Sequence, residues 1–318
     1  MDEPEATARP LTLMTVHAHP DDETIGTGGV MAKAVAEGRR VVLVTCTRGE
    51  MGDIVVPELD TPDNHRRLAE LRAAELEAAM AELGVTEWEN LGYRDSDMMG
   101  RAGNLDPRSF WQADLDDAIG RLVWLVRRYR PDVMTTYNEH GGYGHPDHIR
   151  SHLVAVGAFD RARDPGWYQN QLAAEFGGDG PAIEDGGLEA WQPRKLYEQA
   201  WPASVRRRMA ELIEAAGLQS PWTLPTDATP EQVTEFEDRF ARMTVPDDAI
   251  TTSVDVSAFG EARFRALARH VSQISASGPF FALGIDGWRE LGAKETFILR
   301  EARVPTFPPE TDLFDGLT

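Results

Sequence analysis

Cysteine and basic residues are both scarce in this chain. One of its 318 residues is cysteine, Cys46, so no disulfide can form within the chain, and this composition favours the cytoplasm. The residue lies in the apolar run 41–46, which predicts a packed thiol rather than a nucleophile. Lys and Arg total 32 against 53 Asp and Glu, a net charge of −21. This balance argues against nucleic acid and anionic membrane surfaces as partners.

Long apolar runs are also absent. No segment approaches the roughly 20 apolar residues that a membrane-spanning helix needs. The first ten residues are too polar and acidic for an export signal, so we expect a cytoplasmic protein. The 42% hydrophobic content is enough for one large domain, or for a core with a smaller companion.

The first half of the chain alternates short apolar runs with amphipathic segments. We predict strands at 11–16, 41–46, 87–91 and 133–137, and helices at 27–38, 64–83, 112–129 and 147–160. This βαβα order predicts an α/β fold with a Rossmann-like, mostly parallel sheet covered by helices on both faces.

The second half is less regular and predicts a smaller α+β part. The expected elements are a loop or insertion at 160–194, strands at 195–200 and 251–256, helices at 203–216 and 259–274, a loop at 218–232, and a Pro-rich tail on the surface. We therefore place a Rossmann-like metal-binding catalytic core at 10–160. Residues 161–318 are expected to form a substrate-pocket part integrated with that core.

Two histidines and three carboxylates follow the first predicted strand, within residues 17–23. In open parallel sheets, sites form at the carboxyl ends of the strands. Pro20 ends the strand and turns the chain, so neighbouring side chains can converge. Imidazole and carboxylate together suit a divalent metal such as zinc. Spacing alone does not choose between His17 and His19, because residues two apart in an extended segment point the same way.

A second cluster follows the predicted strand at 133–137. Glycines at 141, 142 and 144 allow tight turns, and they precede or separate Tyr143, His145, Asp147 and His148. Both clusters contain His-Pro-Asp. Two such strand-end clusters are a much stronger indication of a metal centre than either one alone.

The motifs AHPDDE and GGYGHPDH resemble those of the zinc-dependent N-deacetylases of the LmbE/PIG-L type, which cleave the N-acetyl group of N-acetylglucosamine conjugates. Within that family, the chain is most similar to the branch of mycothiol metabolism, which contains S-conjugate amidases and N-acetylglucosaminyl-inositol deacetylases. The supporting segments are 45–50, 72–76, 91–96 and 308–314. The resemblance implies a small glucosamine or thiol-conjugate substrate. The sequence leaves open whether the protein forms a homo-oligomer.

The resemblance also implies a set of site residues. His19, Asp22 and His148 would bind Zn²⁺, with Fe²⁺ as the alternative metal, and His17 would then be a buried, hydrogen-bonded neighbour. Asp21 matches the general base, although a residue before a helix can also act as its N-cap. His145 matches the residue that stabilises the oxyanion and protonates the leaving amine.

Further roles follow from the same resemblance. Asp147 would bond to the imidazole of His145 and keep it charged, and Tyr143 would contact the oxyanion or simply pack. The predicted substrate contacts are Arg72, Asp95 and Asp53, whose alternatives are surface ion pairs for the first two and a solvated carboxylate for the third. We expect His152 to be structural, and His65 and His270 to be solvated.

Some features leave other readings open. Gly26 stands where the amidases have a lysine and the deacetylases a small polar residue; the distal motif resembles the deacetylases and the tail the amidases. The alternatives are a deacetylase of a natural-product glycoside, a nucleotide-binding module suggested by the glycines at 26, 28 and 29, and a metallo-phosphoesterase.

Substrate selection is expected to fall to the C-terminal half, because loops on a rigid scaffold usually provide it. We expect residues 160–194 and 278–281 to line the mouth of the pocket, with Phe280, Phe281 and Trp288 as candidate contacts to an apolar group. Gly26 should leave space, or a missing positive charge, where the amidases place their lysine.

Overall fold

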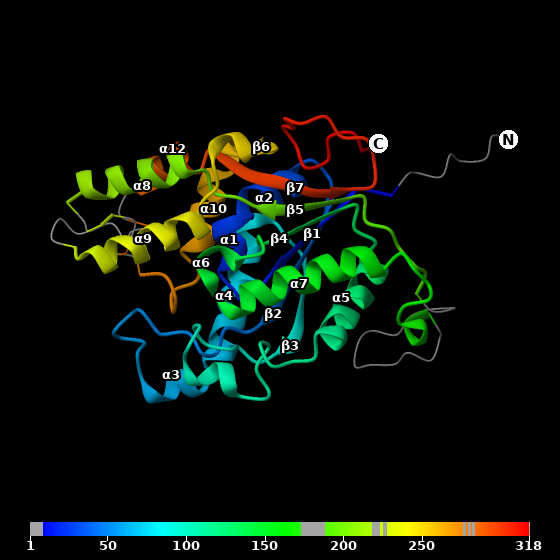
Figure 1. Ribbon diagram of the computed structural model, residues 1–318, viewed down its shortest axis with the longest axis horizontal. Coiled ribbons are helices and arrows are strands. Elements are labelled where there is room, and N and C mark those ends of the chain that lie inside the picture. Colours follow the sequence, from blue (N-terminus) through cyan, green and yellow to red (C-terminus); the bar gives the residue numbers. More distant parts are fainter. Residues whose placement is uncertain are drawn as a thin grey trace.

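Seven strands form one sheet in the computed structural model, which describes residues 9–172, 188–217, 223–224, 228–275, 278, 281 and 284–317 (Figure 1). The order across the sheet is β3-β2-β1-β4-β5-β7-β6. The strands are β1 (Thr12–His17), β2 (Arg40–Thr47), β3 (Glu87–Tyr93), β4 (Val133–Thr136), β5 (Lys195–Gln199), β6 (Thr252–Asp255) and β7 (Lys294–Ala302). Strands β1 to β5 pair in parallel, whereas β7 is antiparallel to both β5 and β6. The predicted mostly parallel sheet is confirmed, although β7 was not foreseen.

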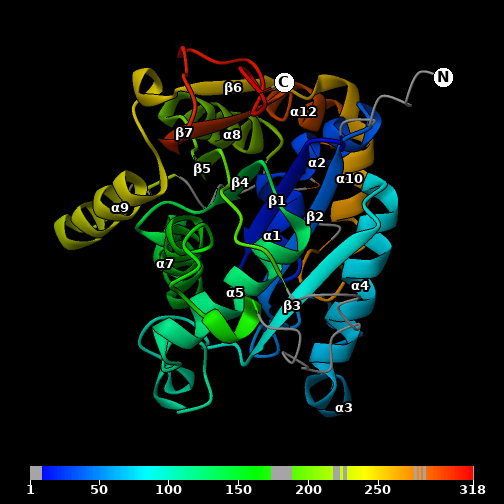
Figure 2. The same ribbon diagram turned by 90° about the vertical axis from the view of Figure 1, so that its right-hand side faces the viewer.

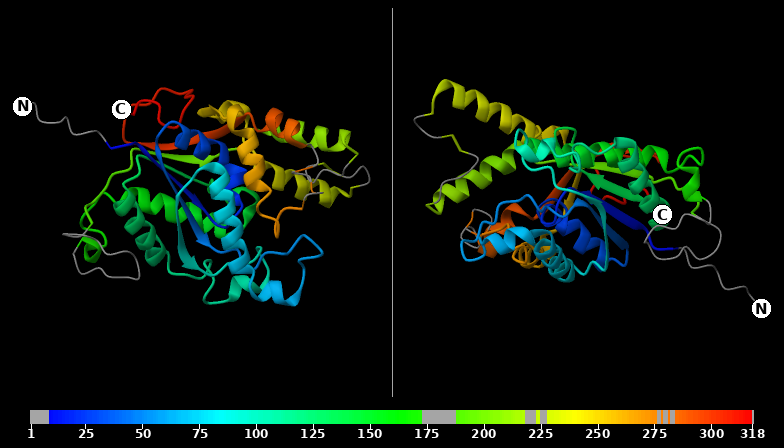
Figure 3. Two further views of the ribbon diagram at one scale, coloured as in Figure 1. Left: turned by 180° about the vertical axis from the view of Figure 1, so that it is seen from behind. Right: turned by 90° about the horizontal axis from the view of Figure 1, so that it is seen from below.

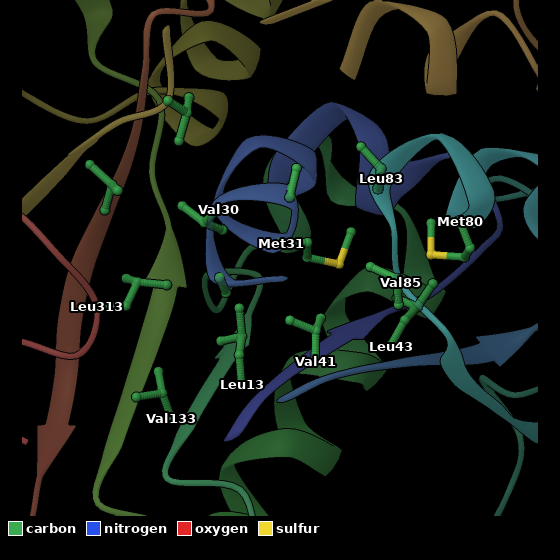
Figure 4. Packing of buried hydrophobic residues seen from close by; sticks show 14 of the residues in the cluster. Leu13, Val30, Met31, Val41, Leu43, Met80, Leu83, Val85, Val133 and Leu313 are labelled. Carbon is green, nitrogen blue, oxygen red and sulfur yellow. The ribbon is translucent and has the colours of Figure 1, made fainter. Parts of the chain in front are cut away.

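Helices cover both faces of the sheet (Figure 2). Helices α2 (Gly28–Ala36), α4 (Leu68–Leu83) and α10 (Gly260–Leu267) contribute to one buried cluster, and α5 (Leu115–Tyr129) and α7 (Pro146–Arg161) to the other. Alternate strand residues enter the two clusters, so that Leu13 and Leu43 point to the first (Figure 4) and Met14 and Val44 to the second. Each buried side chain of this size contributes about 1.5–3 kcal/mol, which explains why strands buried on both faces are continuously apolar.

Several predicted helix boundaries were wrong. The expected helix 64–83 is interrupted at Arg67, between α3 (Pro62–Arg66) and α4, and the expected helix 259–274 ends with α10 at Leu267. Helix α9 (Pro230–Met243) begins inside the expected loop 218–232, where Thr229 and Gln232 form a capping box. It projects from the body of the molecule (Figure 3). The remaining described helices are α1 (Asp22–Gly26), α6 (Gly141–Gly144), α8 (Ala203–Ala215) and α12 (Gly284–Leu291).

The chain reverses its direction across the sheet between β1 and β4. It runs outward from β1 to β2 and β3, and then returns to place β4 on the other side of β1. The carboxyl ends of β1 and β4 therefore lie next to each other at a topological switch point, where open α/β sheets bind ligands. Both polar motifs of the sequence start at these two ends. In the described part of the chain, no helix is long and apolar enough to cross a bilayer.

The Pro-rich tail is part of the core, which corrects the prediction that it packs on the surface. Leu313 and Phe314 belong to the same buried cluster as Leu13 (Figure 4). Glu310 is buried and accepts a hydrogen bond of 2.6 Å from Nζ of Lys195, whose side chain is fully buried at the start of β5. The tail thus closes the face of the sheet near β5 and β7.

Replacing Glu310 by Gln should destabilise the fold, because the ammonium group of Lys195 would stay buried without its counter-charge. Breaking one side of a buried ion pair typically costs about 3–5 kcal/mol, which a urea unfolding curve would show as a lower midpoint. The matched control is Glu211→Gln, which removes one partner of an exposed pair with Arg208 and should leave the midpoint unchanged. Equal midpoints for the two variants would contradict the stabilising role of the buried Lys195–Glu310 pair.

Candidate active site

The turn after β1 is held rigidly by its own polar groups. The N–H of His19 donates to Oδ2 of Asp22 over 3.0 Å, and Arg72 donates to the carbonyl of Pro20. Asp21 has a φ of 103°, in the left-handed region that non-glycine residues rarely adopt. Helix α1 begins directly after it, so the side chains of His19, Asp21 and Asp22 all leave one tight turn.

Asp22 lies between two imidazoles. Its Oδ2 atom is 3.3 Å from Nδ1 of His19 and 3.3 Å from Nε2 of His148, which stands in the first turn of α7. Two ligands each about 2.1 Å from a tetrahedral zinc ion would be about 3.4 Å apart, so each of these two pairs has the spacing of ligands to one ion. Nε2 of His148 is buried and has no hydrogen-bond partner despite the nearby carboxylate. An orphaned nitrogen of this kind is what a metal ligand without its metal would present.

The electrostatics agree with an ionised Asp22. Burial by itself would raise the pKa of its carboxyl, but the facing His148 and His19 lower that pKa well below its usual range. Burial would lower the pKa of His19, but Asp95, Asp147 and Asp22 raise it well above its usual range. His19 would therefore release a proton on binding zinc, which takes imidazole in its neutral form.

His145 is the competitor for a place in the ligand set. Nitrogen atoms of His19, His145 and His148 all lie within 4.8 Å of one another. His145 is also the N-cap of α7, since its Nδ1 accepts the N–H of Asp147 over 3.1 Å. Burial lowers the pKa of His145 well below its usual range, so the ring is neutral with its proton on Nε2. That the metal ligands are His19, Asp22 and His148 stays a prediction.

The carboxylate of Asp147 does not bond to the ring of His145, which corrects that prediction; only its backbone N–H does. Its carboxylate accepts from the backbone and hydroxyl of Ser96 and lies 3.2 Å from Nε2 of His19. A carboxylate bonded to one ring nitrogen fixes the tautomer and orients the other nitrogen toward a metal. Asp147 therefore aims Nδ1 of His19 at Asp22.

Asp21 does not act as a helix cap through its side chain. Although it is the N-cap residue of α1, its carboxylate makes no capping hydrogen bond, and its Oδ2 lies 3.2 Å from Arg72. Burial raises the pKa of Asp21 to about 6, against the opposing effect of Arg72. A carboxylate with a pKa near neutrality is suited to proton transfer.

A cavity of about 150 Å³ opens beside these residues. Tyr143 stands on its wall, 43% exposed, with its ring 4.9 Å from that of His148, and Asp53 lies at the rim with an 81% exposed side chain. The full lining is His19, Asp21, Asp22, Met51, Gly52, Asp53, Arg72, Asp95, Asp97, Met98, Arg101, Tyr143, His145 and Gln273. Sequence patterns did not reveal Met51, Asp97, Met98, Arg101 or Gln273, since nothing local marks such loop residues.

Arg72 and Asp95 are buried rather than paired on the surface. Arg72 donates to the carbonyls of Pro20 and Gly49, and both oxygens of Asp95 accept backbone N–H groups, from Met51 and Asp97. Their predicted contacts with substrate stay predictions. What they demonstrably do is hold the loops around the cavity.

The other histidines divide into two kinds. His17 and His152 are buried and hydrogen-bonded as expected, to Thr27 over 2.8 Å and to the carbonyl of Tyr137 over 2.9 Å. His65 is exposed. The prediction that His270 is solvated was wrong: it is fully buried and bonded to Glu23 over 2.9 Å. The error follows from the helix boundary, because α10 ends before it.

The glycine-rich start of α2 does not bind a nucleotide phosphate. The N–H groups of Gly29 and Val30 donate to the two carboxylate oxygens of Glu295, over 2.7 and 2.8 Å. A buried carboxylate therefore occupies the position at the helix N-terminus that an anion would need. This contradicts the nucleotide-binding alternative.

The space beside Gly26 is shared between the end of the Gln199 side chain and a second cavity. A Cβ atom there would lie 2.0 Å from Oε1 of Gln199. Gly26 and Trp288 line a second cavity of about 520 Å³, which shares no lining residue with the first in the described part of the chain. Phe281 packs against Phe264.

The predicted mouth of the pocket includes residues inside and outside the described part of the chain. Phe280 lies outside the described residues. Residues 160–172 and 188–194, the described parts of the expected insertion, do not line the first cavity, whose described wall comes from the N-terminal half except for Gln273.

Comparisons with known proteins agree on one family. The profile of the PIG-L family, described as GlcNAc-PI de-N-acetylase, matches residues 14–159. The chain is 42% identical over 312 residues to 1D-myo-inositol 2-acetamido-2-deoxy-alpha-D-glucopyranoside deacetylase of Geodermatophilus obscurus, covering 96% of this chain and 97% of that one. The enzyme of the same name from Thermobifida fusca is 40% identical, with 95% and 98% covered. In fold, the chain is similar to N,N'-diacetylchitobiose deacetylase from Pyrococcus horikoshii, with a TM-score of 0.58, 18% identity, and 96% and 86% of the two chains covered.

Metal binding should separate the two candidate ligand sets. His19→Ala and Asp22→Ala should bind zinc at least about 100-fold more weakly, because each removes a ligand, whereas His145→Ala should keep its metal. The measurement is metal bound per chain at a series of free zinc concentrations. The exposed His65→Ala serves as the control. If Asp22→Ala kept its metal and His145→Ala lost it, the third metal ligand would be His145 and not Asp22.

Proposed function

This chain belongs to the PIG-L family of de-N-acetylases, and from that premise we propose that it removes the acetyl group of N-acetylglucosaminyl-inositol with a bound Zn²⁺ ion. The observation that carries the proposal is the position of Asp22 Oδ2, 3.3 Å from both His19 and His148. The substrate is the one in the name of relatives that match nearly the whole chain. Fe²⁺ is the alternative metal, since the same donors accept it.

The deacetylase is favoured over the S-conjugate amidase. The tail that resembles the amidases packs inside the fold, where Glu310 pairs with Lys195 and Phe314 joins the core. The similarity of this tail to the amidases therefore concerns residues that pack in the core, and it does not indicate the substrate. The relatives at 40–42% identity carry the deacetylase name.

Asp21 is proposed as the general base. A divalent ion bound by His19, Asp22 and His148 would supply Lewis acidity, lowering the pKa of water and polarising the amide carbonyl. Asp21 lines the same cavity with its carboxylate and is held there by Arg72. It would take the proton of the attacking water and pass it on as the amide nitrogen leaves.

His145 and Tyr143 are proposed to act on the substrate oxygen. The Nδ1 atom of His145 is occupied by the N–H of Asp147, so its Nε2–H is the group free to donate into the cavity. A donor at this place stabilises the tetrahedral oxyanion. The proton for the departing amine would come from Asp21, because a neutral imidazole has none to give away. Tyr143, on the wall of the same cavity, would add a hydroxyl donor.

The sugar and inositol are proposed to bind along the acidic rim. Asp53 stands at the mouth with an 81% exposed side chain, while Arg72 and Asp95 lie deeper. Carboxylates and a guanidinium match the hydroxyl groups of both rings, since they accept and donate charge-assisted hydrogen bonds.

Asp21→Asn and His145→Ala should each lower kcat about 100-fold or more while the metal stays bound. Proton transfer and oxyanion stabilisation each contribute on that order. Acetate release from N-acetylglucosaminyl-inositol, measured per metal-loaded chain, gives kcat. Near-native turnover by Asp21→Asn would remove it as the base.

The substrate itself is testable with a hydrolysis panel of three compounds. N-acetylglucosaminyl-inositol should give the highest kcat/KM. Free N-acetylglucosamine lacks the inositol ring that the rim would bind, and a mycothiol S-conjugate has both rings but a much bulkier acyl group than acetyl. Equal kcat/KM for free N-acetylglucosamine and the conjugate would show that this rim does not select.

A further inference from the structure

The backbone of Asp21 is held in a conformation that a residue with a Cβ atom disfavours. Its φ is 103° and its ψ is −35°. Such backbone strain persists only where the surroundings impose it. Since the direction of the Asp21 side chain depends on this backbone, the groups that impose the conformation also aim the carboxylate.

One of these groups is the carboxylate of Glu23. Its Oε2 accepts the N–H of Asp21 over 2.8 Å. The carbonyl of Asp21 accepts from the N–H groups of Thr24 and Ile25 over 3.1 and 3.2 Å, in the first turn of α1. The peptide groups on either side of Asp21 are thus bonded within residues 21–25, and Glu23 supplies the only side-chain partner of its N–H in this described turn.

Glu23 in turn is held by a histidine from the far end of the chain. Its second oxygen, Oε1, lies 2.9 Å from Nε2 of His270 and accepts from the hydroxyl of Thr24 over 2.7 Å. The side chains of Glu23 and His270 are both fully buried. His270 follows α10, which packs against α1. A segment 247 residues away therefore sets the position of Glu23.

We propose that Glu23 and His270 form a positioning relay for Asp21, which fixes its backbone and so the direction of its carboxylate into the cavity. This inference rests on the proposed function, in which Asp21 is the base. Neither Glu23 nor His270 lines the catalytic cavity, so they act through Asp21 and not on substrate. The C-terminal half would then contribute to proton transfer from behind the site.

The relay differs from an ordinary buried ion pair in what its loss changes. An ordinary pair, such as Lys195 with Glu310, affects only how much of the protein is folded. Loss of the relay would change kcat of the folded, metal-loaded enzyme, because a small misplacement of a reacting group lowers turnover strongly.

The test compares His270→Leu, which removes the donor to Glu23, with His270→Gln, which keeps an N–H donor at a similar reach. We expect kcat to fall about 100-fold in the leucine variant and less than about 10-fold in the glutamine variant, with KM and zinc content unchanged in both. Glu310→Gln is the control: it should lower the urea midpoint without changing kcat per folded chain. Equal kcat values for His270→Leu and the wild type would overturn the relay.

A double-mutant cycle with Asp21→Asn separates this inference from the proposed function. If His270 acts through Asp21, adding His270→Leu to Asp21→Asn should lower kcat less than about threefold. If the two residues act independently, the losses of kcat in the two single variants would multiply. Near-native activity of Asp21→Asn would refute the base assignment itself. An inactive Asp21→Asn beside a fully active His270→Leu would refute only the relay.

If His270→Leu does not fold, kcat of Glu23→Gln is compared with that of the wild type instead. It keeps the size of the side chain and removes the charge that His270 faces. A fall in kcat of about tenfold or more at unchanged zinc content would support the relay. Unchanged kcat would overturn it.

Discussion

The burial of charge at the carboxyl ends of β1 and β4 is the constraint on which the rest of this structure depends. Asp22, Asp147, His19 and His148 are packed together with little access to water. Buried charges persist only when they are paired, hydrogen-bonded or bound to a metal. Asp147 lies within bonding distance of His19, and a buried nitrogen of His148 has no hydrogen-bond partner, as a metal ligand without its metal would.

The C-terminal half supports that arrangement from several directions. Glu295 caps the N-terminus of α2, Arg263 donates to the carbonyl of Thr24 in α1, and His270 holds Glu23. Lys195 and Glu310 fasten the tail beneath the sheet. Strands of both halves share one sheet, and the second half holds the turn after β1 in place through His270 and Glu23.

A tight, strained turn explains why one short motif carries so many roles. Asp22 lies between His19 and His148, Asp21 lines the cavity, and Glu23 is buried against His270. Between them, the backbone of Asp21 has a φ of 103°. The same crowding raises the pKa of Asp21 to about 6 through burial, while its neighbour Asp22 stays ionised between two imidazoles. Adjacent carboxylates with different surroundings can thus take different parts in one reaction.

The sequence by itself determined the parallel part of the sheet and the position of the two polar clusters at its strand ends. Continuous apolar runs such as residues 41–46 predict strands buried on both faces, and polar residues directly after two of them mark the switch point. It did not determine the end of α10, the role of the tail or the partner of Asp147. These depend on contacts between residues far apart in the chain, such as His270 with Glu23, and no local periodicity encodes them. Only the tertiary structure decided them, because a buried polar group is satisfied by whichever partner the fold brings within reach.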